Sequence, residues 1–390
     1  MNVSNAVRDA LLKKYEKQFG RKPQVLAYAP GRVEILGNHT DYNEGYVLSA
    51  AINFGTNFAV SPRDDMEAHL WAGDIMEETV FDPANPQRTK DKMWSNYVKG
   101  VLAGLNAIKT APHGFDAMFL GDIPLGSGLS SSAALEISAG FALAKLYGIT
   151  VPDLEMARIG QKAEHDFAGV KCGLLDQFSA IHGKKDHLVW SDFRTFDVKS
   201  VPISPEVCFM LCNTKVRHSL ADGDYNERRQ RCEQAAAFFD SVLDRKITAL
   251  RDVSWEEWNR HRTGMDDIVA RRSAHPVGEN ERVLAGIEML RENNLSGFGK
   301  LMFESHNSSR YYFDNSCPEL DTIVDAAAGI PGVYGARLSG GGFGGSAVLM
   351  VAKGETENVS ERVRGVYALK HGDRCDTRVV SCSEGAHVIW

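Results

Sequence analysis

Two stretches of the sequence gather side chains that could do chemistry. Residues 37–45 read GNHTDYNEG and carry two carboxylates, a histidine, two asparagines, a threonine and a tyrosine. Residues 121–136 read GDIPLGSGLSSSAALE, in which glycines and serines precede a helical pattern. The first stretch indicates either a polar turn or a site for a very polar ligand. The second is typical of turns whose free N–H groups and helix dipole bind phosphate.

The glycine–serine stretch also has a simpler explanation. Gly126 and Gly128 would let the backbone approach an anion closely, and the serines that follow would add hydroxyls at the helix start. The same residues would suit a glycine-rich turn with an ordinary serine N-cap. The stretch is not a Walker A loop, because it lacks GK[ST], and it is not a dinucleotide-binding GxGxxG. Both interpretations stay open on these residues alone.

The elements that must position these stretches mix strand and helix. Apolar runs at 25–36, 47–60, 115–124 and 207–214 predict strands, and a hairpin is expected on either side of the glycines at 340–345. Helices are predicted at 3–19, 93–109, 130–147, 153–168 and 354–370, with helical patterns dominating from about 219 to 328. The length of 390 residues favours two domains, for which we expect residues 1–200 and 201–390.

Several motifs resemble one enzyme family. PLGSGLSSSAALE resembles the ATP-binding motif of the GHMP kinases, APGRVEILGNHTDYNEGYVLSAAI resembles the galactokinase signature, and RLSGGGFGGSAVLMV resembles the third GHMP motif. The segments QKAEHDFAGVKCGLLDQF, NTKVRHSLADGDYNERRQRCE and SCPELDTIVDAA are also galactokinase-like, so the resemblance covers essentially the whole chain. It implies an α/β (α+β) fold of two domains. The N-terminal domain would resemble ribosomal protein S5 domain 2, the C-terminal domain would be ferredoxin-like, and the active site would lie between them.

The resemblance implies a sugar 1-kinase that uses ATP and Mg²⁺. Asp176 would be the catalytic base, and Arg32 would keep it ionised. Glu164 and a hydroxyl from Ser131 or Ser132 would hold Mg²⁺, with Ser132 preferred. The sugar would be bound by Asn38, His39, Asp41, Gly173 and Tyr225. ATP would be bound by Trp94, Gly126, Ser127, Gly128, Leu129, Ser130, Ser131, Ser132, Ala133, Gly341 and Gly342. Taken singly, these residues would rather suit turns, caps, solvated helix faces or core packing.

The chain departs from the galactokinase pattern at three places. Asn38 stands where the family usually has glutamate, Tyr311 and Tyr312 replace an acidic pair, and Ser49-Ala50 replaces a proline-containing pair. Asparagine is neutral and would repel a carboxylate at C6 of the sugar less than glutamate would. D-Galactose is the first candidate substrate. A uronic acid, a 6-deoxy sugar or a pentose is the second, and a sensor that binds sugar and ATP without turnover is the third.

Composition excludes some other classes of function. The formal net charge of −7 argues against a partner such as nucleic acid or an anionic membrane. The seven cysteines include no CxxC pair, which favours reduced thiols in the cytoplasm. The N-terminus lacks the apolar core of a signal peptide, and no apolar run is long enough to cross a bilayer. We expect a cytoplasmic monomer, with a dimer as the alternative.

Overall fold

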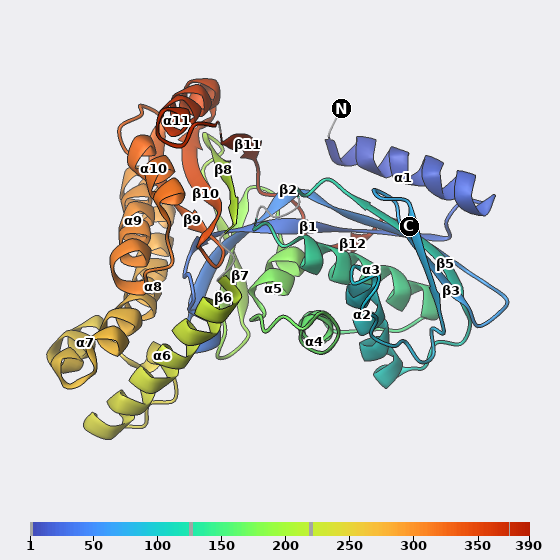
Figure 1. The fold of residues 1–390 in the computed structure, drawn as a ribbon, viewed down its shortest axis with the longest axis horizontal. Coiled ribbons are helices and arrows are strands. Elements are labelled where there is room, and N and C mark those ends of the chain that lie inside the picture. The colour runs from blue at the N-terminus through green and yellow to red at the C-terminus, as the bar shows by residue number, and fades with distance from the viewer. Residues whose placement is uncertain (1–2, 125–127, 218–220, 374) are drawn as a thin grey trace.

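The computed structural model describes residues 3–124, 128–217, 221–373 and 375–390; for residues 3–5, 217 and 221–225 it describes the backbone alone. The elements form two halves, each built on one β-sheet (Figure 1). The first sheet contains β1 (Val25–Leu36), β2 (Tyr46–Pro62), β3 (Ala68–Ala72), β4 (Glu77–Phe81), β5 (Phe115–Gly121), β6 (His187–Asp192), β7 (Val198–Pro202) and β12 (His387–Val388). The second sheet contains β8 (Val207–Arg217), β9 (Val333–Ser339), β10 (Gly344–Ala352) and β11 (Asp376–Val380).

The first sheet has helices on both faces. Leu11 and Tyr15 of α1 (Val3–Phe19) pack on one face against β1, β2 and β5. The opposite face carries α2 (Ser95–Ile108), α3 (Ser131–Tyr147), α4 (Asp153–Lys162) and α5 (Leu175–His182) (Figure 1). The sequence predicts one helix over 153–168, but α4 ends at Lys162 and a π-helical turn, Ala163–Ala168, follows it. Such turns are frequent at functional sites.

The second sheet is antiparallel and is covered by the C-terminal helices. Its strand order is β11-β8-β10-β9, and the predicted hairpin is formed by β9 and β10. The helices of this half are α6 (Ala221–Val242), α7 (Trp255–His261), α8 (Asp267–Arg291), α9 (Leu295–Ser308), α10 (Pro318–Ala327) and α11 (Thr356–His371). A second π-helical turn, Ser309–Phe313, follows α9. No helix within the described residues is both long and apolar enough to cross a bilayer.

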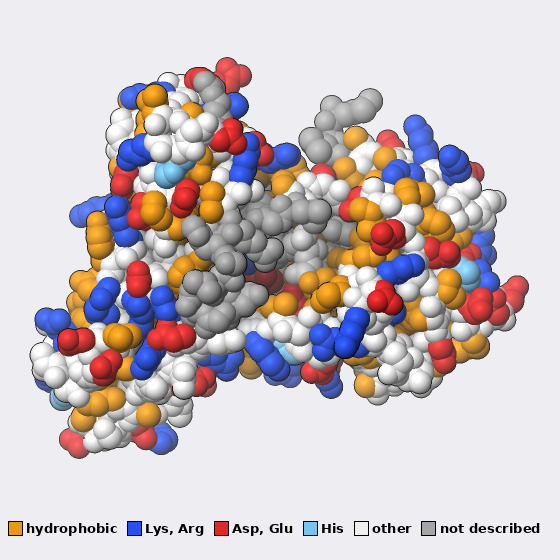
Figure 2. Space-filling view, in the orientation of Figure 1, with side chains coloured by type: hydrophobic (Ala, Val, Ile, Leu, Met, Phe, Trp, Pro, Cys, Tyr) orange, Lys and Arg blue, Asp and Glu red, His pale blue; other side chains and the backbone are white. Residues whose placement is uncertain are grey.

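The two halves share a hydrophobic core. Val33 and Ile35 of β1 belong to the same buried cluster as Phe209 of β8, Val348 of β10 and Ile287 of α8. β12 also returns to pair with β1, so the end of the chain joins the first sheet. On the face shown in Figure 2, acidic and basic side chains are interspersed over both halves. The shared core fixes the halves against each other, which a site built from both of them requires.

Candidate active site

A cavity of about 370 Å³ opens where segments from both halves meet. Most of its lining comes from β1, the 37–45 segment, the stretch 169–176 and the glycine loop 340–343 between β9 and β10. The lining residues are Arg32, Glu34, Asn38, His39, Asp41, Gly169, Val170, Lys171, Cys172, Gly173, Leu175, Asp176, Asn226, Gly340, Gly341, Gly342 and Phe343. A volume of this size suits a small polar molecule.

The strongest feature of the cavity is an ion pair between Arg32 and Asp176. Arg32 Nε lies 2.8 Å and Arg32 Nη2 lies 2.7 Å from Asp176 Oδ1. The ladder between β1 and β2 is irregular between Pro30 and Arg32, and such bulges re-aim side chains. Asp176 lies in the first turn of α5, where the helix dipole favours a negative charge. Its side chain keeps 23% of its surface exposed, so a substrate can reach it.

The start of α3 lies against this ion pair. Ser130 has a left-handed backbone with φ of 57° and makes no side-chain cap of its helix; instead its hydroxyl donates to Asp176 Oδ2. Arg32 Nη1 donates to the carbonyl oxygen of Gly128 at 2.6 Å, and Arg32 N donates to that of Leu129 at 3.1 Å. The predicted phosphate turn and the predicted base are therefore joined through one arginine.

Glu164 and Ser132 also meet. Ser132 Oγ of α3 donates to Glu164 Oε1 of the π-helical turn at 2.8 Å. Burial, and next the charge of Asp176, raise the pKa of Glu164 above its ordinary value. A cation bound here would reduce the free-energy cost of keeping the Glu164 carboxylate charged. One carboxylate and one hydroxyl are hard oxygen donors of the kind that Mg²⁺ accepts beside phosphate oxygens and water. The described residues contain no cluster of three or more His, Cys, Asp or Glu side chains that could hold a metal alone.

Asn38 is buried and its amide is already hydrogen-bonded. Its side chain donates from Nδ2 to Gly340 O at 2.9 Å, and its Oδ1 accepts from Asn315 Nδ2 at 3.3 Å. The residue is only 1% exposed. Its partners belong to the C-terminal half, so Asn38 ties the 37–45 segment to the glycine loop. The adjacent Glu34 lines the same end of the cavity.

His39 and Asp41 complete this wall. His39 Nδ1 lies 2.9 Å from the Tyr42 hydroxyl and Nε2 lies 3.4 Å from Gly341 O. Burial lowers the pKa of His39 to about 3, so the ring is neutral. Asp41 packs directly on Gly173, since a Cβ added there would lie 1.7 Å from Asp41 Oδ2. Only glycine at position 173 lets the two segments approach this closely.

The other predicted site residues have different locations. Gly341 and Gly342 line the cavity, whereas Ser131 and Ala133 lie in the first turn of α3 outside its lining. Trp94 packs on Phe119 with ring centroids 5.7 Å apart and is not among the lining residues. Gly126 and Ser127 lie outside the described residues, as does the side chain of Tyr225. Its neighbour on α6, Asn226, does line the cavity.

Two of the three departures lie away from the cavity lining. Tyr311 and Tyr312 are 58% and 41% exposed, and their carbonyl groups accept hydrogen bonds from Arg271 and Arg272. Ser49 is buried in β2, where its hydroxyl lies 2.7 Å from that of Ser179 on α5. Neither departure reshapes the lining directly. Among the three, only Asn38 belongs to it.

Sequence reasoning missed a set of buried charges behind the 37–45 segment. Glu279 of α8 is fully buried and accepts hydrogen bonds from Gly37 N at 2.8 Å and Asn38 N at 3.1 Å. Glu34 pairs with the fully buried Arg337, with Arg337 Nη1 3.2 Å from Glu34 Oε1. Glu34 lies inside the recognised motif APGRVEILGNHTDYNEG and could have been noticed there. Glu279 has no such local signal, because it lies inside an unremarkable helical pattern.

Comparisons with known proteins agree with this arrangement. Residues 13–62 match the model of the galactokinase galactose-binding signature, 96–184 the GHMP kinase N-terminal domain and 287–369 the GHMP kinase C-terminal domain. The galactokinase of Pasteurella multocida is 39% identical over 381 residues, which cover 96% of this chain and 97% of that protein. The galactokinase of Chloroflexus aggregans is 40% identical over 379 residues and 96% of each chain.

This chain belongs to the galactokinase family. The crystal structure of the Lactococcus lactis galactokinase complexed with galactose superimposes with a TM-score of 0.92 at 33% identity, covering 98% of this chain and 99% of that one. The mevalonate kinase of Methanococcus jannaschii shares the fold alone, with a TM-score of 0.62 at 20% identity. The predicted fold class is therefore confirmed: the chain has the two-domain GHMP kinase fold of the galactokinase family.

Proposed function

We propose that this protein transfers the γ-phosphoryl group of ATP to the C1 hydroxyl of D-galactose, giving α-D-galactose 1-phosphate and ADP. The observation that carries the proposal is the Arg32–Asp176 ion pair, exposed to the cavity beside the start of α3. Asp176 accepts the proton of the C1 hydroxyl as the oxygen attacks phosphorus. Arg32 orients that carboxylate and faces the negative charge on the transferring group.

The remaining predicted residues take complementary roles in this proposal. The free N–H groups at the start of α3 and the glycine loop bind phosphate oxygens. Ser132 and Glu164 would hold Mg²⁺, which supplies positive charge against the phosphates of ATP. Together these groups provide positioning and charge stabilisation, which dominate catalysis of phosphoryl transfer. Their joint presence favours an active kinase over a sensor without turnover.

The charges at the Asn38 end of the cavity favour a neutral sugar. Asn38 is itself uncharged, but the carboxylate of Glu34 lies beside it and is ion-paired with Arg337. The lining carries the carboxyl groups of Glu34, Asp41 and Asp176 beside the cationic Arg32 and Lys171. Burial raises the pKa of Glu34 and of Asp41, so this end of the cavity already disfavours negative charge, and a uronate would bring a further one. Glu34 thus keeps a carboxylate at this end although residue 38 carries none, and galactose is favoured over galacturonate.

The proposal is tested by ADP release with ATP and Mg²⁺ against a sugar panel. The panel contains galactose, galacturonate, L-arabinose, fucose and glucose. We expect galactose to give the highest kcat/KM and galacturonate to be a poor substrate. If galacturonate were the preferred sugar, the proposal that Glu34 and Asn38 favour a neutral sugar would be wrong. ATP binding without ADP release on any of these sugars would instead favour the sensor.

Galactose binding should depend on pH through Asp41. Burial, followed by the charge of Glu34, raises the pKa of Asp41 to about 7. Below this pH the carboxyl is protonated, and above it the carboxylate can accept hydrogen bonds from sugar hydroxyls. We expect the galactose KM to fall about tenfold from one pH unit below this pKa to one unit above it. Steady-state kinetics across this range measure the effect, and Asp41→Asn should give a higher KM that no longer varies with pH.

A further inference from the structure

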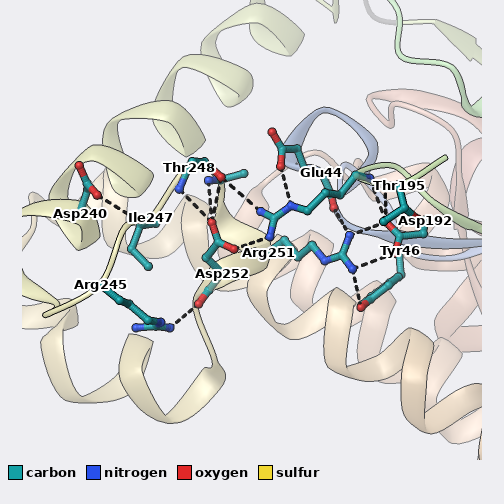
Figure 3. Close-up of polar contacts among 12 residues, drawn as sticks. Glu44, Tyr46, Asp192, Thr195, Asp240, Arg245, Ile247, Thr248, Arg251 and Asp252 are labelled. Atoms are coloured by element: carbon teal, nitrogen blue, oxygen red, sulfur yellow. Dashed lines mark hydrogen bonds and ion pairs between the residues drawn. The ribbon is translucent and has the colours of Figure 1, made fainter. Parts of the chain in front are cut away.

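Two arginines and two aspartates form crossed ion pairs between the halves of the molecule. Asp192 ends β6, and Arg194 follows it in the turn to β7. Arg251 and Asp252 belong to the 3-10 turn Leu250–Asp252, which follows α6. Arg251 Nη2 lies 2.8 Å from Asp192 Oδ2 (Figure 3). Arg194 Nη1 lies 2.6 Å from Asp252 Oδ1. We call these four residues the arginine junction.

Both arginines of the junction also contact the end of the 37–45 segment. Arg251 Nη1 donates to Glu44 O at 3.0 Å (Figure 3). Arg194 Nε donates to Glu44 Oε2 at 2.7 Å. Glu44 has a left-handed φ of 56°, which a non-glycine residue adopts only when its surroundings hold it there. Arg251 Nη2 further donates to the Tyr46 hydroxyl at 2.7 Å, and its guanidinium lies 4.3 Å from the centroid of that ring.

The pair between Arg251 and Asp192 is the buried part of the junction. The two side chains are 15% and 7% exposed, whereas Arg194 and Glu44 are 34% and 43% exposed. Exposed ion pairs contribute little, but a largely buried guanidinium whose two Nη groups bind Asp192, Glu44 and Tyr46 restricts the position of each partner. Arg251 is therefore the member through which the junction holds the 37–45 segment.

The same turn is fastened to α6 on its other side. Asp240 near the end of α6 accepts a hydrogen bond from Ile247 N at 2.9 Å, and Arg245 donates to the carbonyl oxygen of Asp252 (Figure 3). The opposite end of α6 carries Asn226, which lines the cavity. Contacts thus run from α6 through the turn and Arg251 to the 37–45 segment, and both elements contribute to the cavity lining. The two also touch directly, since the Arg229 guanidinium of α6 lies 5.7 Å from the centroid of the Tyr42 ring.

We propose that Arg251 is a positioning residue that sets the affinity for the sugar without touching it. It holds the 37–45 segment at a fixed place relative to α6, so that Asp41, His39 and Asn38 meet the sugar in one arrangement. The inference rests on the proposed sugar kinase function. It requires that the sugar site depends on Arg251 and that the phosphate turn at the start of α3 does not. Arg251 bonds Glu44, Tyr46 and Asp192, and the described residues of that turn, 128–132, make no hydrogen bond with the junction.

The test compares Arg251→Ala and Tyr46→Phe with the control Arg260→Ala. Arg260 lies on α7, its side chain is 63% exposed, and it pairs with Glu256 rather than with the junction or residues 37–46. We expect Arg251→Ala to raise the galactose KM about tenfold, as expected for loss of about 1.4 kcal/mol of binding. Tyr46→Phe removes only the hydrogen bond from Arg251 to the Tyr46 hydroxyl and should fold normally. It should therefore raise the galactose KM less than Arg251→Ala does. The ATP KM and kcat at saturating sugar should stay unchanged in both variants. Arg260→Ala should leave the galactose KM, the ATP KM and kcat unchanged.

A double-mutant cycle and two readouts decide the outcome. Arg251→Ala and Asp192→Asn remove the same pair, so their effects on galactose KM should be less than additive. Equal increases of the sugar KM and the ATP KM, or a lower melting temperature with unchanged KM values, would overturn the proposal. If the sugar panel selects another sugar, the proposed function fails on wild-type protein alone. The junction is then tested with the selected sugar, so the two failures remain distinguishable.

Discussion

An Asp176→Asn variant should bind ATP and galactose but turn over about 10²–10⁴-fold more slowly than the wild type, the usual contribution of a general base. Asparagine keeps the shape of the side chain: its Oδ1 can still accept from Arg32, and its Nδ2 can donate to the Ser130 hydroxyl, which now donates to Asp176. It cannot take a proton from the C1 hydroxyl. Chemistry should therefore be lost while binding is kept. Steady-state kcat, together with calorimetric titration of ATP and galactose, measures the two separately.

The control for this variant is Asp244→Asn. Asp244 is an exposed aspartate that does not line the cavity, so the same change of charge there should leave kcat unchanged. A kcat of Asp176→Asn within a factor of ten of wild type would remove Asp176 as the base. Loss of galactose binding with a normal kcat at saturating sugar would instead assign Asp176 to the sugar site. Only a selective loss of kcat agrees with the proposed mechanism.

Arg32 and Asp176 could be chosen from the sequence because each lies inside a recognisable local stretch, APGRVEI and CGLLDQF. The contact between them could not be read from spacing, because 144 residues separate them. The long apolar runs of β1 and β2 likewise predict strands directly. β4 has only five residues, none of them buried, so the hydrophobic alternation that reveals a strand is weak there.

Buried charges are the part of the site that local patterns conceal. Arginine is normally a surface residue, and nothing around Arg337 in RLSGG indicates that it is fully buried. Its burial depends on Glu34, which lies 303 residues away in the chain. Asn38 is a second example: the replacement of glutamate by asparagine suggested an altered contact with C6 of the sugar, but the sequence did not reveal the partners of the side chain. The structure adds that its amide bonds Gly340 and Asn315 and that Glu34 lies beside it.

These buried charges explain how the 37–45 segment keeps its shape. Its first residues are held by Glu279 of α8, and Tyr46 N, just after its last residue, donates to Asn280 Oδ1 of the same helix at 2.9 Å. The crossed arginines hold Glu44. A segment with so many polar groups and no regular pairing is fixed largely by the C-terminal half. We infer that the sugar site forms only when the two halves are packed together.

Glu279→Gln, a change behind the cavity wall, should therefore destabilise the protein strongly. Glu279 is fully buried and pairs with Arg282. Burial alone would raise the pKa of Glu279, but the charge of Arg282, assisted by His275 and Arg337, outweighs it and holds the pKa well below the ordinary value. Glutamine would leave the largely buried guanidinium of Arg282 without its counter-charge. Its side-chain N–H₂ would also compete with the N–H groups of Gly37 and Asn38, which are donors themselves. The loss of a buried partner typically costs about 3–5 kcal/mol.

The same helix offers a matched control, because Glu288 and Arg291 repeat the spacing of Glu279 and Arg282 at the surface. Both side chains of this second pair are more than 60% exposed, so Glu288→Gln should cost about 0–1 kcal/mol. Denaturant unfolding of the two variants measures the difference, and the galactose KM should rise in Glu279→Gln alone.

The contribution of Glu279 to stability should depend on pH. Because the folded pKa of Glu279 is lowered, its contribution to the unfolding free energy is complete above its ordinary pKa and is lost as pH falls toward the folded value. The difference in unfolding free energy between wild type and Glu279→Gln should therefore become smaller in acid. If Glu279→Gln and Glu288→Gln lowered the unfolding free energy equally at neutral pH, Glu279 would not hold the 37–45 segment.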